Sequence, residues 1–118
     1  MRGYKIVQEG NKWRFQLIPN NNNRQEVGSS VFFDSYEECV ASVAIFRKFI
    51  LDHHVNSIES FGVSVVQSNK EAFLEYRVNG QAFFRSRKYS SSAPKTQCKK
   101  CVASIYKHID PYTLKRVF

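Results

Sequence analysis

The sequence predicts an α+β fold, a two-layer sandwich in which two helices cover one face of a shared antiparallel sheet. Three runs of alternating apolar and polar residues come first, and a segment with apolar residues at helical spacing follows them. The same order then returns, and the pentapeptide CVASV at 39–43 returns as CVASI at 101–105. We therefore expect a single domain, 1–118, made of two tandem β-β-β-α-β repeats at about 1–58 and 59–118.

Shorter echoes upstream of the pentapeptide support the repeat. They run in the same order at offsets of 59 and 56 residues, against 62 for the pentapeptide, so the two copies differ only by small gaps. Val7-Gln8 returns as Val66-Gln67, and Ser30, Phe33 and Ser35 return as Ser86, Tyr89 and Ser91.

Alternation predicts three strands in each half. Residues 4–8 and 13–18 flank a turn at 9–11, and a polar loop with Pro19 and four asparagines precedes a third strand at about 25–33. In the second half the strands are expected at 62–67, 72–78 and 81–88. Asn79-Gly80 joins the last two, and this pair suits a type I′ hairpin because both central residues need a positive φ.

Each triplet of strands precedes a helix. Ser35 and Glu38 form a capping box, and the helix is expected to continue to about Leu51. The second helix is expected to open at 92–94, with Ser92 as the cap and Pro94 in the first turn, and Pro111 stops it. A short strand should follow each helix, at 55–60 and 112–118. The buried line of the second helix is predicted to be Cys98, Cys101, Val102, Ile105 and Ile109.

Residues 76–91, YRVNGQAFFRSRKYSS, resemble the motif of small bacterial YegP-like domains. That motif has an Arg-containing strand, Asn-Gly, a third strand, and Ser-x-x-Tyr-x-Ser before a helix; the first half carries a weaker form, NKWRFQL followed by SSVFFDSYEECVASV. The resemblance implies β(3)-α-β units that form one sheet and exchange their last strands. It implies no catalytic residues, because no activity is established for the family. This chain departs from the pattern by its Asn-rich loop and its basic second half.

Composition indicates a folded protein that does not cross a membrane. Hydrophobic residues make up 42% and charged residues 24% of the chain, which is typical of globular domains. No apolar run is long enough to span a bilayer, and the N-terminus lacks the apolar core of a secretory signal. We expect a cytoplasmic monomer or weak dimer in which Cys39, Cys98 and Cys101 are free thiols.

Candidate chemistry is sparse, and no catalytic residue, metal ligand or cofactor is predicted. Cys98-x-x-Cys101 is half of a zinc site or a redox pair in some proteins, but Cys101 repeats the position of Cys39, so packing explains it. His53 and His54 suit a helix C-terminus. The serines at 29–30 and 90–92 are interpreted as strand ends and caps, and Glu71 and Glu75 as solvent-facing strand residues. These patterns do not predict an enzyme.

Charge gives the strongest functional signal. The formal charge is +8; residues 1–59 hold seven basic and seven acidic side chains, whereas 60–118 hold eleven basic and only three acidic ones. This asymmetry predicts a binding module for an anionic partner, with nucleic acid or another polyanion as the candidate. The alternative is a protein–protein adaptor that uses its sheet edges and has no nucleic-acid role. The predicted anion contacts are Arg77, Arg85, Arg87, Lys88, Lys99 and Lys100.

Overall fold

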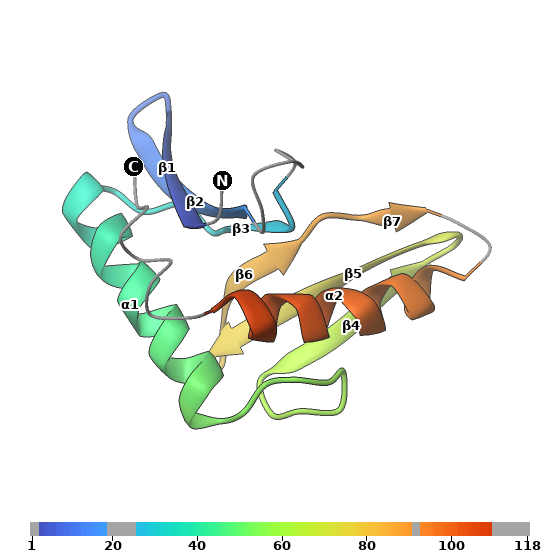
Figure 1. Cartoon of the computed structure of the whole chain (residues 1–118). Coiled ribbons are helices and arrows are strands. Elements are labelled where there is room, and N and C mark those ends of the chain that lie inside the picture. The colour runs from blue at the N-terminus through green and yellow to red at the C-terminus, as the bar shows by residue number, and fades with distance from the viewer. Residues whose placement is uncertain (1–2, 19–25, 91–92, 110–118) are drawn as a thin grey trace.

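A computed structural model describes residues 3–18, 26–90 and 93–109 of the chain. These residues form an antiparallel sheet of seven strands and two helices, which confirms the predicted α+β sandwich (Figure 1). The sheet order is β1-β2-β3-β6-β5-β4, and β7 pairs with β5. The elements are β1 (Gly3–Glu9), β2 (Lys12–Ile18), β3 (Gly28–Ser30), α1 (Tyr36–Asp52), β4 (Val63–Ser68), β5 (Glu71–Val78), β6 (Gln81–Ser86), β7 (Tyr89–Ser90) and α2 (Pro94–His108).

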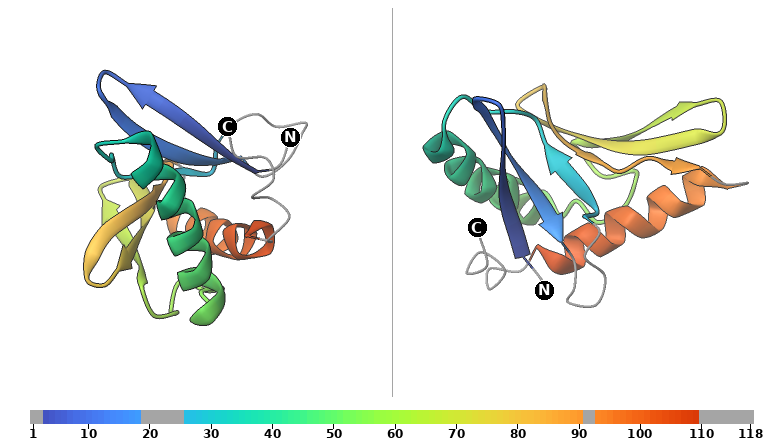
Figure 2. Two further views of the ribbon diagram at one scale, coloured as in Figure 1. Left: turned by 90° about the vertical axis from the view of Figure 1, so that its left-hand side faces the viewer. Right: turned by 90° about the horizontal axis from the view of Figure 1, so that it is seen from above.

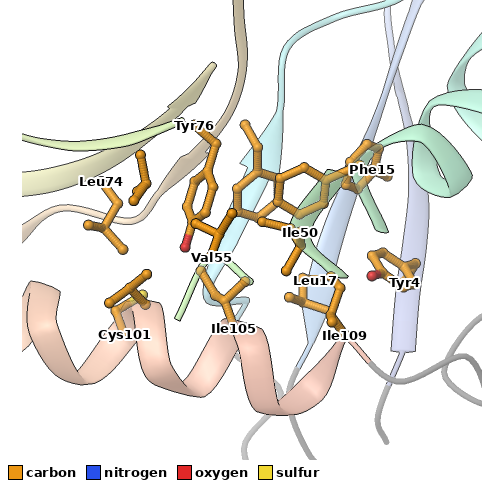
Figure 3. Close-up of a cluster of buried hydrophobic side chains, with 14 of the residues drawn as sticks. Tyr4, Phe15, Leu17, Ile50, Val55, Leu74, Tyr76, Cys101, Ile105 and Ile109 are labelled. Carbon is orange, nitrogen blue, oxygen red and sulfur yellow. The ribbon is translucent and has the colours of Figure 1, made fainter. Parts of the chain in front are cut away.

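Both helices cover the same face of the sheet, as the right-hand view of Figure 2 shows. Phe46 of α1 lies at the centre of the core, with ring-centre distances of 4.6 Å to Phe84, 5.4 Å to Tyr76 and 5.8 Å to Phe15. The buried line of α2 packs beside these rings, with Cys101, Ile105 and Ile109 facing the strands in Figure 3. The opposite face of the sheet is therefore free of helices in the described part of the chain, and we call it the outer face.

The two halves of the sheet meet where β3 pairs with β6, with Gly28 opposite Ser86 and Ser30 opposite Phe84. One serine in each half of the sheet accepts a hydrogen bond from a backbone amide of the neighbouring strand. The hydroxyl of Ser30 accepts from the Phe15 amide at 2.9 Å, and that of Ser86 accepts from the Leu74 amide at 2.8 Å. The two serines are 56 residues apart and the two amides 59 residues apart, which are the offsets seen in the sequence. The duplication itself stays a prediction.

The local signals for turns and helix starts are largely confirmed. Asn79 and Gly80 have φ values of 55° and 79°, as a type I′ turn requires. The Ser35 hydroxyl accepts from the Glu38 amide at 3.1 Å and caps α1. Pro94 stands in the first turn of α2 as predicted, after Ala93, which makes no side-chain capping bond; Ser92, the predicted cap, lies outside the described residues.

The short strand predicted at 55–60 is wrong, because this segment forms turns. The backbone reverses at His54, where φ is 48°. The Ser60 hydroxyl then accepts from the amides of Asn56 and Ser57 at 3.2 Å and 3.1 Å, so these donors bond locally and not to a neighbouring strand. The other predicted strand, 112–118, and the loop at 19–25 lie outside the described residues.

The run at 81–88 is interrupted. β6 ends at Ser86, and the chain resumes pairing with β5 only in β7. Within β6, Tyr76 pairs with Phe84 but Arg77 pairs with Ala82, so Phe83 is the extra residue of a β-bulge. The bulge brings the rings of both Phe83 and Phe84 near Phe46. Because Phe84 faces the helices, the next residue, Arg85, faces the outer side of the sheet.

Candidate anion-binding site

A hollow of about 360 Å³ lies over the seam between β3 and β6. Its position follows from the sequence, because β3 carries only small side chains while the neighbouring strands carry long ones. The small residues form the floor, and arginines from β2 and from the end of β6 stand around it. We call this site the seam hollow; it is lined by Arg14, Glu26, Gly28, Ser29, Ser30, Val31, Phe32, Arg85, Ser86 and Arg87.

Gly28 allows β3 to approach β6 this closely. A Cβ atom added at Gly28 would lie 2.5 Å from the carbonyl oxygen of Arg85 and 2.6 Å from the ring of Phe84. Real Cβ atoms are not found at such distances, so the position requires glycine. The backbone of the seam, and with it the placement of Arg85, therefore depends on the absence of a side chain here.

Arg14 stands on the outer face because its neighbour Phe15 faces the helices. Its Nη2 lies 2.6 Å from Oε2 of Glu9, and its guanidinium carbon lies 5.1 Å from the ring centre of Phe32. Its Nε is buried and has no hydrogen-bond partner in the described part of the chain. Phe32 keeps 46% of its surface exposed beside this guanidinium. The pair presents a cation and an aromatic ring at the hollow.

Glu75 joins two of the predicted basic residues. Its two carboxylate oxygens accept from Nε of Arg77 and Nε of Arg85, each at 3.1 Å, and Glu75 is only 9% exposed. The expectation that Glu75 faces solvent as an ordinary strand residue is wrong, because arginines flank it on its own strand and on β6. This carboxylate neutralises part of the local charge and also fixes the Nε side of Arg85, so that the Nη groups remain as donors.

Arg87 completes the group, since it lines the seam hollow together with Arg85. Its guanidinium carbon lies 5.3 Å from the ring centre of Tyr89. Lys88 is exposed between β6 and β7 and does not line the hollow. Arg77 does not line the hollow either; its Nη1 donates to the Gly80 carbonyl at 3.0 Å.

The six predicted contacts do not gather on one face. Arg77 and Arg85 lie on the outer face, whereas Lys99 and Lys100 are exposed on α2, which covers the other face (Figures 1 and 2). The structure instead adds Arg14 and Phe32, which sequence reasoning missed. A signal for Arg14 existed: in NKWRFQL its neighbours Trp13 and Phe15 are apolar, so alternation directs Arg14 outward. The zero net charge of the first half concealed it.

The cysteines lie in the core, as the packing interpretation expected. Burial raises the pKa of the Cys39 and Cys101 thiols to about 11, and it also raises that of Cys98. Such thiols are poor nucleophiles at neutral pH, because the thiolate is the reactive form. Among the described residues, His, Cys, Asp and Glu side chains form no group of three that could hold a metal ion.

We expect the three thiols to resist labelling while the protein is folded. At pH 8 a thiol with a pKa near 11 is about one part in a thousand thiolate, and burial also limits access of the reagent. Ellman's reagent should therefore react slowly with the native protein, and with three thiols at once after addition of guanidinium chloride. Fast reaction of one or two thiols in the native state would contradict the buried positions of Cys98 and Cys101.

Comparison with known proteins gives no relative. No protein-family model, curated protein or solved structure matches the chain. Within the described residues, neither helix is long and apolar enough to span a bilayer.

Proposed function

We propose that this protein is a non-enzymatic binding module that holds a phosphate-bearing polyanion in the seam hollow. The observation that carries the proposal is the convergence of Arg14, Arg85 and Arg87 on one hollow from both halves of the sheet. Guanidinium groups suit phosphate because their planar donors match two oxygens at once. Lys99 and Lys100 take no part in this site.

The charge balance of the seam hollow favours an anion. Three arginines line it against one carboxylate, Glu26. Glu9 and Glu75 each occupy part of one arginine but leave other donors of that guanidinium unused, since each guanidinium has five N–H groups. The Nε of Arg14 is buried, so the donors that a ligand can reach on this guanidinium are its Nη groups.

Single-stranded nucleic acid is the polyanion that fits this chemistry best. Phe32 exposes an aromatic ring next to Arg14, so an unpaired base can stack beside a phosphate held by the arginine. In a duplex the base faces are already stacked on one another and are not offered to a side chain. We therefore propose phosphate contacts from the arginines and base stacking by Phe32.

We also propose kinship with the YegP-like domains. The motif at 76–91 supports it, as does the order of three strands and a helix followed by four strands and a helix within one sheet. The proposal carries no activity with it, because none is established for that family.

The test is the salt dependence of binding to a fluorescein-labelled oligothymidylate, followed by fluorescence anisotropy. Three arginine–phosphate contacts should give a slope of about −2 in a plot of log K against log salt concentration, because each contact releases counterions from the single strand. The affinity should also exceed that for the same sequence in a duplex. Absence of binding at low salt, or binding that salt does not weaken, would falsify the proposal.

A further inference from the structure

Among the described residues, no strand pairs with one side of the β4 backbone. β4 ends the sheet, and the Arg77 amide donates to the Gly62 carbonyl at 2.8 Å at the start of its pairing with β5. Backbone groups in an antiparallel ladder alternate, so those of Val63, Val65 and Gln67 point away from β5. In the described part of the chain no backbone group bonds to them. Such an edge is a template for one more strand.

A second hollow, of about 390 Å³, lies beside this edge. We call it the β4 groove; α2 bounds it on the helix side, and the turn after α1 closes one end. No salt bridge joins its lysines to a carboxylate of the described residues, and Glu59, which also lines the groove, pairs with neither lysine. Its apolar lining residues are Ile58, Val63 and Val65, and its charged ones are Glu59, Lys95 and Lys99.

The start of α2 lacks the negative charge that helix N-termini favour. α1 has a serine cap and two acidic residues, Glu37 and Glu38, in its first turn. Among the described residues, no side chain caps α2, and its first turn carries Lys95 and no acidic residue. A cation at this end opposes the helix dipole, so a carboxylate brought by a partner would satisfy both the lysines and the helix.

We propose that the β4 groove binds an extended acidic peptide segment, which adds as a strand to the edge of β4 and places alternate carboxylates on Lys95 and Lys99. The spacing agrees with this arrangement. Residues four apart on a helix rise about 6 Å, and residues two apart on a strand rise about 6.6 Å, so two acids on one face of the incoming strand match the two lysines. The side chain between these two acids points to the other face of the incoming strand, away from the groove.

This site is separate from the seam hollow. Arg14 and Arg85 of the seam hollow lie on the outer face of the sheet, whereas Lys95 and Lys99 belong to the helix that covers the other face (Figure 2). The two sites share no lining residue. The inference therefore does not depend on nucleic-acid binding.

The probe is a fluorescein-labelled peptide that alternates glutamate and valine, with a peptide that alternates lysine and valine as its counterpart. Only the acidic peptide should bind. The double change Lys95→Glu/Lys99→Glu should weaken binding of the acidic peptide at least tenfold. The matched control, Lys100→Glu/Lys107→Glu, makes the same charge change on the solvent side of α2 and should not weaken it. Substituting the three arginines of the seam hollow should leave this binding unchanged.

A second variant tests strand addition. Gln67→Pro removes an outward N–H at an exposed edge position, where proline is tolerated, and it should weaken the acidic peptide while circular dichroism stays unchanged. The proposal is overturned if the acidic peptide does not bind, or if both lysine pairs affect it equally. It is also overturned if the Lys95/Lys99 change weakens the binding of oligothymidylate and not the binding of the peptide. A further contrary outcome is that the β4 edges of two copies pair with each other and exclude the peptide.

Discussion

Simultaneous replacement of Arg14, Arg85 and Arg87 by alanine is expected to weaken oligothymidylate binding by about a thousandfold or more. Each arginine–phosphate contact is a charge-assisted hydrogen bond, worth about 1.5 kcal/mol or more when it is formed away from bulk water. The salt slope should fall by about 2, because the counterions released by three contacts are no longer released. Anisotropy titrations at several salt concentrations measure both quantities.

The matched control is the triple change Lys88→Ala, Lys100→Ala and Lys107→Ala. It removes the same formal charge from exposed positions that do not line the seam hollow. If binding depends only on net charge, the two triple variants will lose affinity equally, and the seam hollow is then not the site. Circular dichroism must show both variants folded; Glu75 keeps Arg77 as a partner after the change at Arg85.

The sequence predicts most of the fold because its signals are local. The serine cap at Ser35, the Asn79-Gly80 turn and the buried line of α2 each follow from a few neighbouring residues, and each is found in the structure. The strand predicted at 55–60 is absent because its backbone amides form local hydrogen bonds instead. The hydroxyl of Ser60 captures the amides that a strand at 55–60 would have offered to a neighbour.

The candidate site was less predictable because it depends on pairing between distant strands. Arg14 and Arg85 line one hollow only because β3 joins β2 to β6, and sequence periodicity does not tell which distant strands pair. Glu75 likewise meets Arg85 through the pairing of β5 with β6. Charge counted along the chain placed the whole excess in the second half, whereas the sheet brings one arginine of the neutral half into the same site.

Gly28→Ala is expected to lower the free energy of unfolding by about 1–3 kcal/mol, the usual cost of overpacking. The new methyl group would meet the carbonyl oxygen of Arg85 at 2.5 Å, and a backbone atom cannot rotate away as a side chain can. Urea denaturation should therefore show a lower midpoint with an unchanged m-value. Ser29→Ala, the adjacent position in β3, should stay within about 0.5 kcal/mol of the natural protein.

A second substitution separates the two conflicts at Gly28. Phe84→Leu removes the ring that lies 2.6 Å from the added Cβ, but it leaves the Arg85 carbonyl in place. The cost of Gly28→Ala should therefore be smaller in the Phe84→Leu background, though not zero, and a double-mutant cycle measures the difference. Because the same carbonyl belongs to an arginine of the seam hollow, Gly28→Ala should also weaken oligothymidylate binding. Full stability with full binding would show that β3 and β6 do not approach as closely as the seam requires.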